Sequence, residues 1–209
     1  MTVDENNLLQ ESRKENCFRF LAGSLYYPEK SVFEEAELFN KLTEFLKDVC
    51  PEALPFSTEM EKNFAQYSEN ELQVEYSRLF KGPYELIAAP YGSVYLDEGR
   101  RVMGDSTIAV IQAYEEEGLA KNDDFKDLPD HIVVELEFMS FLLFKEIEAI
   151  QDQDSQKANE YQEKQQRFLN MFLRQWVPSF CEKIKNGSDN SFYISLSNCL
   201  STFIMNPKF

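Results

Sequence analysis

The chain offers few residues that could do chemistry, and only one run of them matches a catalytic motif. Asp123, Asp124 and Asp127 form a D-D-x-x-D pattern. In helical prenyl-diphosphate enzymes this pattern holds magnesium ions that bridge a diphosphate, because hard cations take carboxylate oxygens. Here the pattern lies in a polar connector between Gly118 and Pro129, and no second aspartate-rich motif follows. A magnesium-dependent prenyl-diphosphate enzyme acting through Asp123–Asp127 is therefore kept only as an alternative.

Other catalytic and metal-binding patterns are missing from the sequence. His131 is the one histidine, so neither paired Glu-x-x-His motifs nor an H-E-x-x-H zinc site can be formed. There is no phosphate-binding glycine loop of either common type. The four cysteines lie far apart without a C-x-x-C pair, which predicts reduced thiols in a core rather than metal ligands. We predict no catalytic residue, no metal and no cofactor.

Length and charge narrow the class of protein further. At 209 residues the chain fits a single domain, 1–209. A formal net charge of −16 argues against nucleic acid as a partner, since phosphate binding requires a basic surface. The acidic N-terminal residues do not form a signal peptide, and no apolar run reaches membrane-spanning length. These features predict a cytoplasmic protein without stable membrane association.

The apolar residues recur at helical spacing throughout, and glycine is scarce, with only 7 residues. This predicts an all-α fold of about eight to ten helices. Capping-box pairs predict helix starts at Ser31 (with a helix running on to Val49), at Thr58 and at Ser68. Helix ends are predicted at prolines and glycines: Pro28, Pro51, Gly82, Gly118, Pro178 and Gly187.

The helix after the polar connector is the most apolar of the chain. Its apolar residues surround it on most sides from His131 to about Ile150, which predicts a buried central helix. Asp130 is predicted to cap its first turn. The connector, residues 119–130, is predicted to be a hinge between two helical halves, and such a hinge would permit a domain-swapped dimer.

Between residues 75 and 139 the chain carries five short sequence blocks in a fixed order. Together they resemble the signature of the TorD/DmsD family, cytoplasmic chaperones, related to NarJ, that mature molybdenum-containing respiratory oxidoreductases. The blocks are Glu75–Pro83, Ala89–Asp97, Met103–Thr107, Leu128–Ile132 and Glu135–Met139.

This resemblance implies a non-enzymatic chaperone in which one domain binds the N-terminal twin-arginine signal peptide of a precursor. The client would be the apo form of a molybdopterin-containing oxidoreductase of the DMSO-reductase type, held until its cofactor is inserted. The resemblance also implies weak guanine-nucleotide binding, and a monomer or a domain-swapped homodimer. A generic helical protein-interaction module is the second alternative, because the same aromatic spacing occurs in any helix core.

The same blocks predict where the leader would bind. Aromatic and apolar residues would receive the apolar part of the leader, and acidic residues would pair with its arginines. The predicted binding residues are Tyr76, Leu79, Phe80, Pro90, Tyr91, Tyr95, Gly104, Asp127, Asp130 and His131.

Overall fold

The computed structural model describes residues 3–82, 86–99, 102–119 and 127–209. Within these residues the chain is helical and contains no β-strand, so the prediction of an all-α fold is confirmed. The helices are α1 (Val3–Ser24), α2 (Lys30–Glu35), α3 (Leu38–Val49), α4 (Leu54–Gln66), α5 (Glu69–Tyr76), α6 (Ser93–Leu96), α7 (Asp105–Glu116), α8 (Ile132–Gln151), α9 (Ser155–Phe168), α10 (Arg174–Gly187) and α11 (Ser191–Ile204), with π-helical turns at Ser77–Lys81 and Leu169–Leu173.

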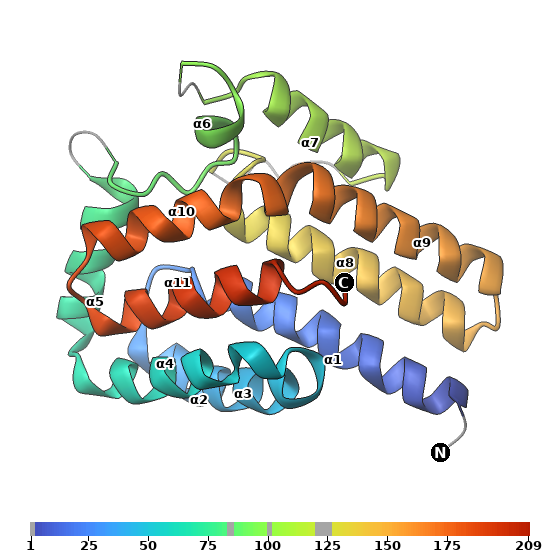
Figure 1. The fold of residues 1–209 in the computed structure, drawn as a ribbon, viewed down its shortest axis with the longest axis horizontal. Coiled ribbons are helices and arrows are strands. Elements are labelled where there is room, and N and C mark those ends of the chain that lie inside the picture. Colours follow the sequence, from blue (N-terminus) through green and yellow to red (C-terminus); the bar gives the residue numbers. More distant parts are fainter. Residues whose placement is uncertain (1–2, 83–85, 100–101, 120–126) are drawn as a thin grey trace.

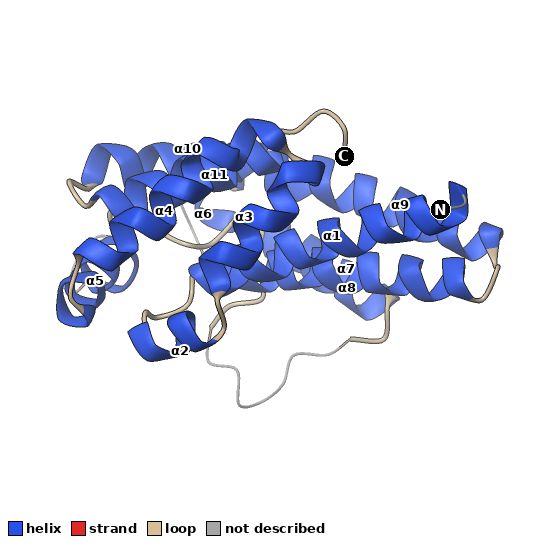
Figure 2. Ribbon diagram, turned by 90° about the horizontal axis from the view of Figure 1, so that it is seen from below, coloured by secondary structure: helices blue, strands red, loops and turns tan. Residues whose placement is uncertain are grey.

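Helix α8 lies in the middle of this arrangement (Figure 1). It packs along α1 on one side and α9 on another, while α11 packs against α4 and α10. Residues on most sides of α8 are buried, including Ile132, Leu136, Met139 and Leu143, so the prediction of a buried central helix is confirmed. Figure 2 shows that the short helix α2 stands at the edge of the bundle beside α3.

The core is filled mainly by aromatic and branched apolar side chains that come from nearly all of these helices. Trp176, Phe18, Phe180 and Phe203 are completely buried. All four cysteines are buried and free, as the sequence predicts. A core of this extent fixes the relative positions of the helices that carry the five sequence blocks.

Several helix boundaries follow the sequence signals. Ser68 and Glu71 form a capping box at the start of α5, with side chain and backbone bonded reciprocally. Helix α3 ends before Pro51, and α10 ends at Gly187. Gly118 follows α7 with φ of +70°, a conformation that glycine adopts without strain.

Three predicted boundaries are wrong. The helix from Ser31 to Val49 is broken at Glu37, where φ is 51°, because α2 and α3 must turn to bury Phe33 and Phe39 together. Helix α4 begins at Leu54 rather than at Thr58, since Pro55 fixes a helical φ in the first turn.

The third wrong boundary is the predicted helix end at Pro178. This residue lies inside α10, close to the start of that helix after the π-helical turn Leu169–Leu173. A proline inside a helix removes one backbone hydrogen bond and strains the preceding turn, but it does not have to end the helix, and α10 continues to Gly187.

Candidate functional site

The candidate site is formed where three of the sequence blocks meet. Helix α5 passes directly into the π-helical turn Ser77–Lys81, which is closed by a hydrogen bond from Gly82 N to Ser77 O of 2.6 Å. Turns of this type are rare and frequently occur at functional sites. Leu79 and Phe80 of this turn are buried in the core, while Lys81 is exposed.

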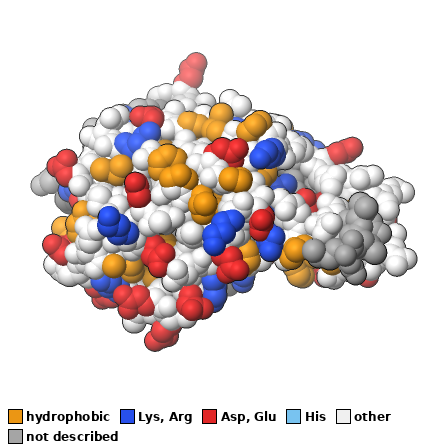
Figure 3. All heavy atoms as spheres, turned by 60° about the horizontal axis from the view of Figure 1, so that its bottom comes forward, with side chains coloured by type: hydrophobic (Ala, Val, Ile, Leu, Met, Phe, Trp, Pro, Cys, Tyr) orange, Lys and Arg blue, Asp and Glu red, His pale blue; other side chains and the backbone are white. Residues whose placement is uncertain are grey.

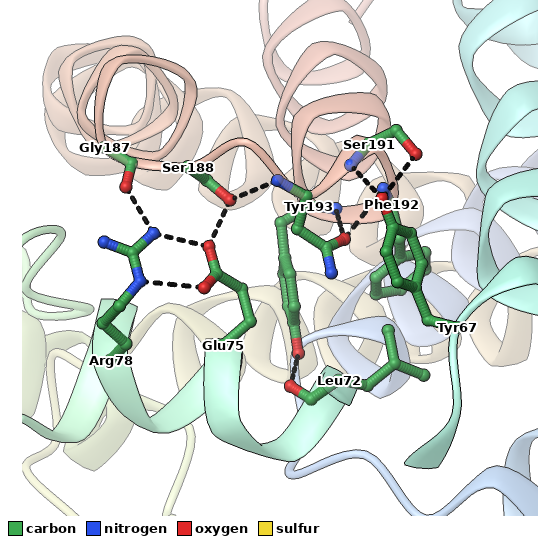
Figure 4. A network of polar contacts seen from close by, with 10 residues as sticks. Tyr67, Leu72, Glu75, Arg78, Gly187, Ser188, Ser191, Phe192 and Tyr193 are labelled. Atoms are coloured by element: carbon green, nitrogen blue, oxygen red, sulfur yellow. Dashed lines mark hydrogen bonds and ion pairs between the residues drawn. The ribbon is translucent and has the colours of Figure 1, made fainter. Parts of the chain in front are cut away.

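A polar network attaches α5 to the turn between α10 and α11 (Figure 4). The Arg78 guanidinium donates two hydrogen bonds to the carboxylate of Glu75, of 2.8 and 2.6 Å, and a third to Gly187 O of 2.5 Å. The Ser188 hydroxyl also donates to Glu75, and the Tyr193 hydroxyl donates to Leu72 O at 2.9 Å. The network therefore fixes the position of α5 against α10 and α11.

The loop of the second block is held against the start of α8 by backbone hydrogen bonds. Ile132 N donates to Pro90 O at 2.8 Å, and Gly92 N donates to Asp130 O at 2.9 Å. Tyr91 and His131 form an isolated antiparallel bridge between these two bonds. The two segments therefore behave as one short ribbon, which places the Tyr91 ring 5.4 Å from the His131 ring.

Six neighbouring residues, among them Tyr27 from the segment between α1 and α2, make a region that we call the tyrosine patch. The Tyr27 and Tyr76 rings meet edge to face with centroids 5.4 Å apart. The ammonium group of Lys81 lies 4.9 Å from the centroid of Tyr27 and 5.5 Å from that of Tyr76. The Tyr91 hydroxyl donates to Asp127 Oδ1 at 3.2 Å. The patch consists of Tyr27, Tyr76, Lys81, Tyr91, Asp127 and His131.

Burial shifts the pKa values of three residues of the tyrosine patch, Tyr76, Tyr91 and His131, toward their neutral forms. Burial, and after it the charge of Asp127, raises the pKa of Tyr76 and of Tyr91 to about 12. Burial lowers the pKa of His131, against the opposite effect of the nearby Asp127. The patch thus presents the exposed ring of Tyr27 and the half-buried ring of Tyr91 beside the exposed carboxylate of Asp127, while Tyr76 and His131 lie buried beneath them at 7% and 6% exposure.

The predicted role of Asp130 as the cap of α8 is wrong. His131 is the N-cap residue, and its Nδ1 accepts a hydrogen bond from Val133 N at 3.2 Å. Asp130 is only 1% exposed, and its Oδ2 accepts from Ser93 N at 2.8 Å. The imidazole lone pair reaches the free N–H of the first turn, which leaves the Asp130 carboxylate to hold the loop in place.

The loop residue Tyr95 points inward rather than toward the patch. Its ring stacks on Trp176 with centroids 5.5 Å apart, and Trp176 Nε1 donates to Glu135 Oε2 at 2.9 Å. Glu135 is fully buried, and burial raises its pKa well above the ordinary range of a glutamate. Gly92 passes so close that a Cβ there would lie 3.1 Å from both Glu135 and Trp176.

The remaining predicted residues are spread over the surroundings of the site. Leu79 is 0% exposed and Phe80 is 5% exposed, so in this conformation both belong to the core. Pro90 is buried, and its carbonyl oxygen accepts the hydrogen bond from Ile132 N. Gly104 precedes α7 and lies against Asp97, whose carboxylate a Cβ would approach to 2.1 Å. The structure thus gathers Tyr76, Tyr91, Asp127 and His131, and their leader-binding role stays a prediction.

Sequence reasoning missed two members of the tyrosine patch, Tyr27 and Lys81. Tyr27 is 40% exposed and follows Tyr26, which is 45% exposed and donates to the Glu137 carboxylate. A pair of tyrosines directly before Pro28 is a signal that could have been used, because exposed tyrosines make good contact residues. We interpreted the pair only as the end of a helix.

The D-D-x-x-D motif lies largely outside the described residues, which include only Asp127 of it. Among the described residues no group of three or more histidines, cysteines, aspartates or glutamates is arranged to hold a metal ion. None of the described helices is both long and apolar enough to cross a membrane.

His131 should make the stability of the protein dependent on pH. Its pKa is lowered in the folded state, so the cap of α8 contributes fully above the unfolded pKa of ~6.5 and is lost as pH falls below it. Between pH 7 and 5 we expect the wild type to lose about 1 kcal/mol more stability than His131→Asn, since Asn caps a helix without titrating. Urea unfolding at a series of pH values measures this. Parallel stability curves for the two proteins would show that protonation of His131 does not break the cap.

Comparison with known proteins shows which family and which relatives the chain resembles. The family model described as "Nitrate reductase delta subunit" matches residues 29–182. The chain is 28% identical over 198 residues to the chaperone protein TorD of Photobacterium profundum, covering 95% of this chain and 82% of that protein. It is 28% identical over 178 residues to the Tat proofreading chaperone DmsD of Salmonella typhi, covering 83% and 79%. The match to TorD of Vibrio parahaemolyticus spans 60% of that relative.

A solved structure shows the same fold. A candidate redox enzyme maturation protein from Archaeoglobus fulgidus superposes with a TM-score of 0.53 at 21% identity, covering 90% of each chain. At this identity the likeness concerns the arrangement of helices, which agrees with the architecture described above.

Proposed function

The chain belongs to the nitrate reductase delta subunit family, with TorD and DmsD chaperones among its relatives, and from that premise we propose that it is a redox-enzyme maturation chaperone. It binds the twin-arginine leader and the apo form of a molybdopterin-containing oxidoreductase of the DMSO-reductase type. Binding holds the precursor in the cytoplasm until its cofactor is inserted. The chaperone itself performs no catalysis.

The observation that carries this proposal is the tyrosine patch. Tyr27 is 40% exposed, and Tyr91 is half-buried beside the exposed carboxylate of Asp127. Tyrosine offers a large contact area at a low cost in conformational entropy, which suits an apolar peptide segment. An arginine of that segment would pair with Asp127 through a charge-assisted hydrogen bond. Asp127 is the carboxylate that the patch presents, since that of Asp130 is buried.

Lys81 supports the same assignment. Its ammonium group already lies within cation–π distance of the Tyr27 and Tyr76 rings. These rings are therefore arranged to receive a cation, and a guanidinium of the leader would displace Lys81 from them. Arginine stacks on aromatic rings better than lysine because its planar group is more weakly hydrated.

The overall charge favours such an encounter. A protein with a net charge of −16 attracts a basic segment over a long range and raises the rate of association. We further propose that the protein works as a monomer or as a domain-swapped dimer whose hinge is residues 119–130. Residues 120–126 of this hinge lie outside the described part of the chain. Weak guanine-nucleotide binding stays a prediction from the resemblance.

Recovery of the client from cells tests the proposed function. The tagged chain is expressed in its source organism under anaerobic growth, purified and analysed by mass spectrometry. We expect a molybdoenzyme precursor with its N-terminal leader intact, bound to the wild type and depleted when Tyr27 and Tyr91 are both replaced by Ala. Recovery of only unrelated proteins, or of the client without its leader, would contradict the proposal.

A further inference from the structure

Glu135 is a buried acidic residue next to the loop that carries Tyr91, although it is not part of the tyrosine patch. It lies one turn after His131 at the start of α8, where its N–H donates to His131 O at 3.1 Å, and it is 0% exposed. Figure 3 shows acidic and basic side chains dispersed over one face of the molecule, where water solvates them. Glu135 lacks that solvation, so the groups around it determine its charge state.

The carboxyl group of Glu135 has a single hydrogen-bond partner within the described residues. Trp176 Nε1 of α10 donates to its Oε2 at 2.9 Å. Its other oxygen, Oε1, is buried and accepts no hydrogen bond from the described part of the chain. The backbone of Gly92 covers this oxygen, since a Cβ built on Gly92 would lie 3.1 Å from Oε1. One donor is too few to stabilise a buried negative charge, which normally requires several.

The titratable groups that face Glu135 do not favour a negative charge on it. Asp130, at the start of the same helix, is itself buried and acts as a like charge. From α7, Tyr114 donates its hydroxyl hydrogen to a backbone carbonyl at 3.0 Å, and from the loop the Tyr95 ring stacks on Trp176. Burial raises the pKa of Glu135 well above its usual range, the Trp176 N–H opposes this effect, and the charge of Asp130 adds to it.

The loop that covers Glu135 is the segment that positions Tyr91. Gly92 follows Tyr91 directly and donates its N–H to Asp130 O at 2.9 Å. Ser93 N donates to Asp130 Oδ2 at 2.8 Å, and from Ser93 the chain continues into α6, which packs on α10 (Figure 1). A charge on Glu135 would need water at Oε1, and the backbone of Gly92 occupies that place. The protonation of Glu135 and the position of the loop are therefore coupled.

We propose that Glu135 is a positioning residue of the tyrosine patch, which holds the loop Ala89–Asp97 in place as a neutral carboxylic acid. The proton stays on Oε1, because leaving one neutral hydroxyl unpaired costs far less than burying a charge. Loss of this proton to water leaves a carboxylate and releases the loop together with the ring of Tyr91. The effect on leader binding rests on the proposed function, whereas the proton and its coupling to the loop are independent of it.

The pH dependence of stability tests whether Glu135 is neutral in the folded protein. A glutamate in the unfolded chain ionises above pH ~4.3, so folding takes up one proton wherever Glu135 is still protonated. Above that pH the stability falls as pH rises, until the folded protein also loses the proton. Relative to Glu135→Gln, the unfolding equilibrium constant of the wild type should rise by up to about tenfold per pH unit. Urea unfolding followed by the fluorescence of Trp176, the only tryptophan, measures this constant.

Two further variants serve as controls. Glu135→Met also cannot titrate and has an apolar side chain of similar length, so its pH profile should match that of Glu135→Gln, and the test stands if only one of them folds. Glu148→Gln removes the same charge from a partly exposed position of α8, where Glu148 is paired with Lys145, and should keep the wild-type profile. Parallel profiles of the wild type and the Glu135 variants would overturn the proposal.

Hydrogen exchange tests whether the loop is what Glu135 holds. The amides of Gly92 and Ser93 are bonded to Asp130 and exchange when the loop opens. We expect them to exchange faster than the core amide of Leu196, which requires global unfolding. Their exchange should also rise with pH more steeply in the wild type than in Glu135→Gln, by up to about tenfold per pH unit. Equal steepness in the two proteins would mean that Glu135 does not position the loop.

Leader titrations at several pH values separate this inference from the proposed function. We expect the affinity of the wild type for a synthetic twin-arginine leader to fall with rising pH more steeply than that of Glu135→Gln. A leader that binds at no pH, while loop exchange keeps its steep pH dependence, would contradict the proposed function and support the coupling of Glu135 to the loop. A leader that binds equally well at every pH would support the proposed function and refute the role of Glu135 in the tyrosine patch.

Discussion

Replacing Tyr27 and Tyr91 together with Ala is expected to lower the affinity for a twin-arginine leader peptide by roughly 100-fold, as for aromatic hot spots in other interfaces. The double variant removes two rings of the tyrosine patch together with the hydrogen bond from Tyr91 to Asp127. Neither residue belongs to the buried core, so the melting temperature should change little. Isothermal titration calorimetry gives the affinity, and circular dichroism gives the melting temperature.

A matched control is available on α8. Phe144 is a half-exposed aromatic residue, at 50%, that lies outside the patch, and Phe144→Ala should bind the leader normally. Tyr91→Phe isolates the hydroxyl, and it should lose only the part of the affinity that depends on the position of Asp127. Normal leader binding by the Tyr27/Tyr91 double variant would show that the tyrosine patch does not bind the leader.

Leu79→Ala is expected to lower the free energy of unfolding by about 2–5 kcal/mol, because it opens a cavity in the core. Leu79 is completely buried, and its side chain reaches toward Gly187 at the end of α10. Urea unfolding measures the change. Val74→Ala is the control on the adjacent helix α5, since Val74 is 59% exposed and its truncation should change stability by less than about 0.5 kcal/mol.

The same variant decides whether Leu79 also contacts the leader. Under conditions in which Leu79→Ala is still folded, we expect its leader affinity to match that of the wild type. A lower affinity combined with unchanged stability would mean that Leu79 becomes exposed in the bound state, as the sequence resemblance implies. A side chain this deeply buried cannot contact a ligand unless the π-helical turn rearranges.

The helical fold could be predicted because its signals are local. The apolar period identified α8 as the buried helix, and the Ser68–Glu71 pair fixed the start of α5. The break at Glu37 could not be predicted in this way. It is imposed by the packing of rings from three different helices, and helical spacing along one segment contains no information about that packing.

The candidate site was predicted in part for a similar reason. Tyr76, Tyr91, Asp127 and His131 come from recognisable blocks, and the fold brings them together. Tyr27 belongs to no block and reaches the site only through the ends of α1 and α5. That His131 rather than Asp130 caps α8 also depended on tertiary structure. The Asp130 carboxylate accepts a hydrogen bond from Ser93 N of the second block, and the local sequence does not reveal this contact.

We propose that the tyrosine patch binds the twin-arginine leader. The most direct test of this proposal is a titration of the protein, carrying ¹³C in its tyrosine rings, with a synthetic twin-arginine leader peptide. We expect saturable shifts of the ring signals of Tyr27, Tyr76 and Tyr91, with Tyr67 at the end of α4 and Tyr161 of α9 unchanged as internal references. Saturable binding that leaves all three patch tyrosines unshifted, or the absence of binding, would contradict it.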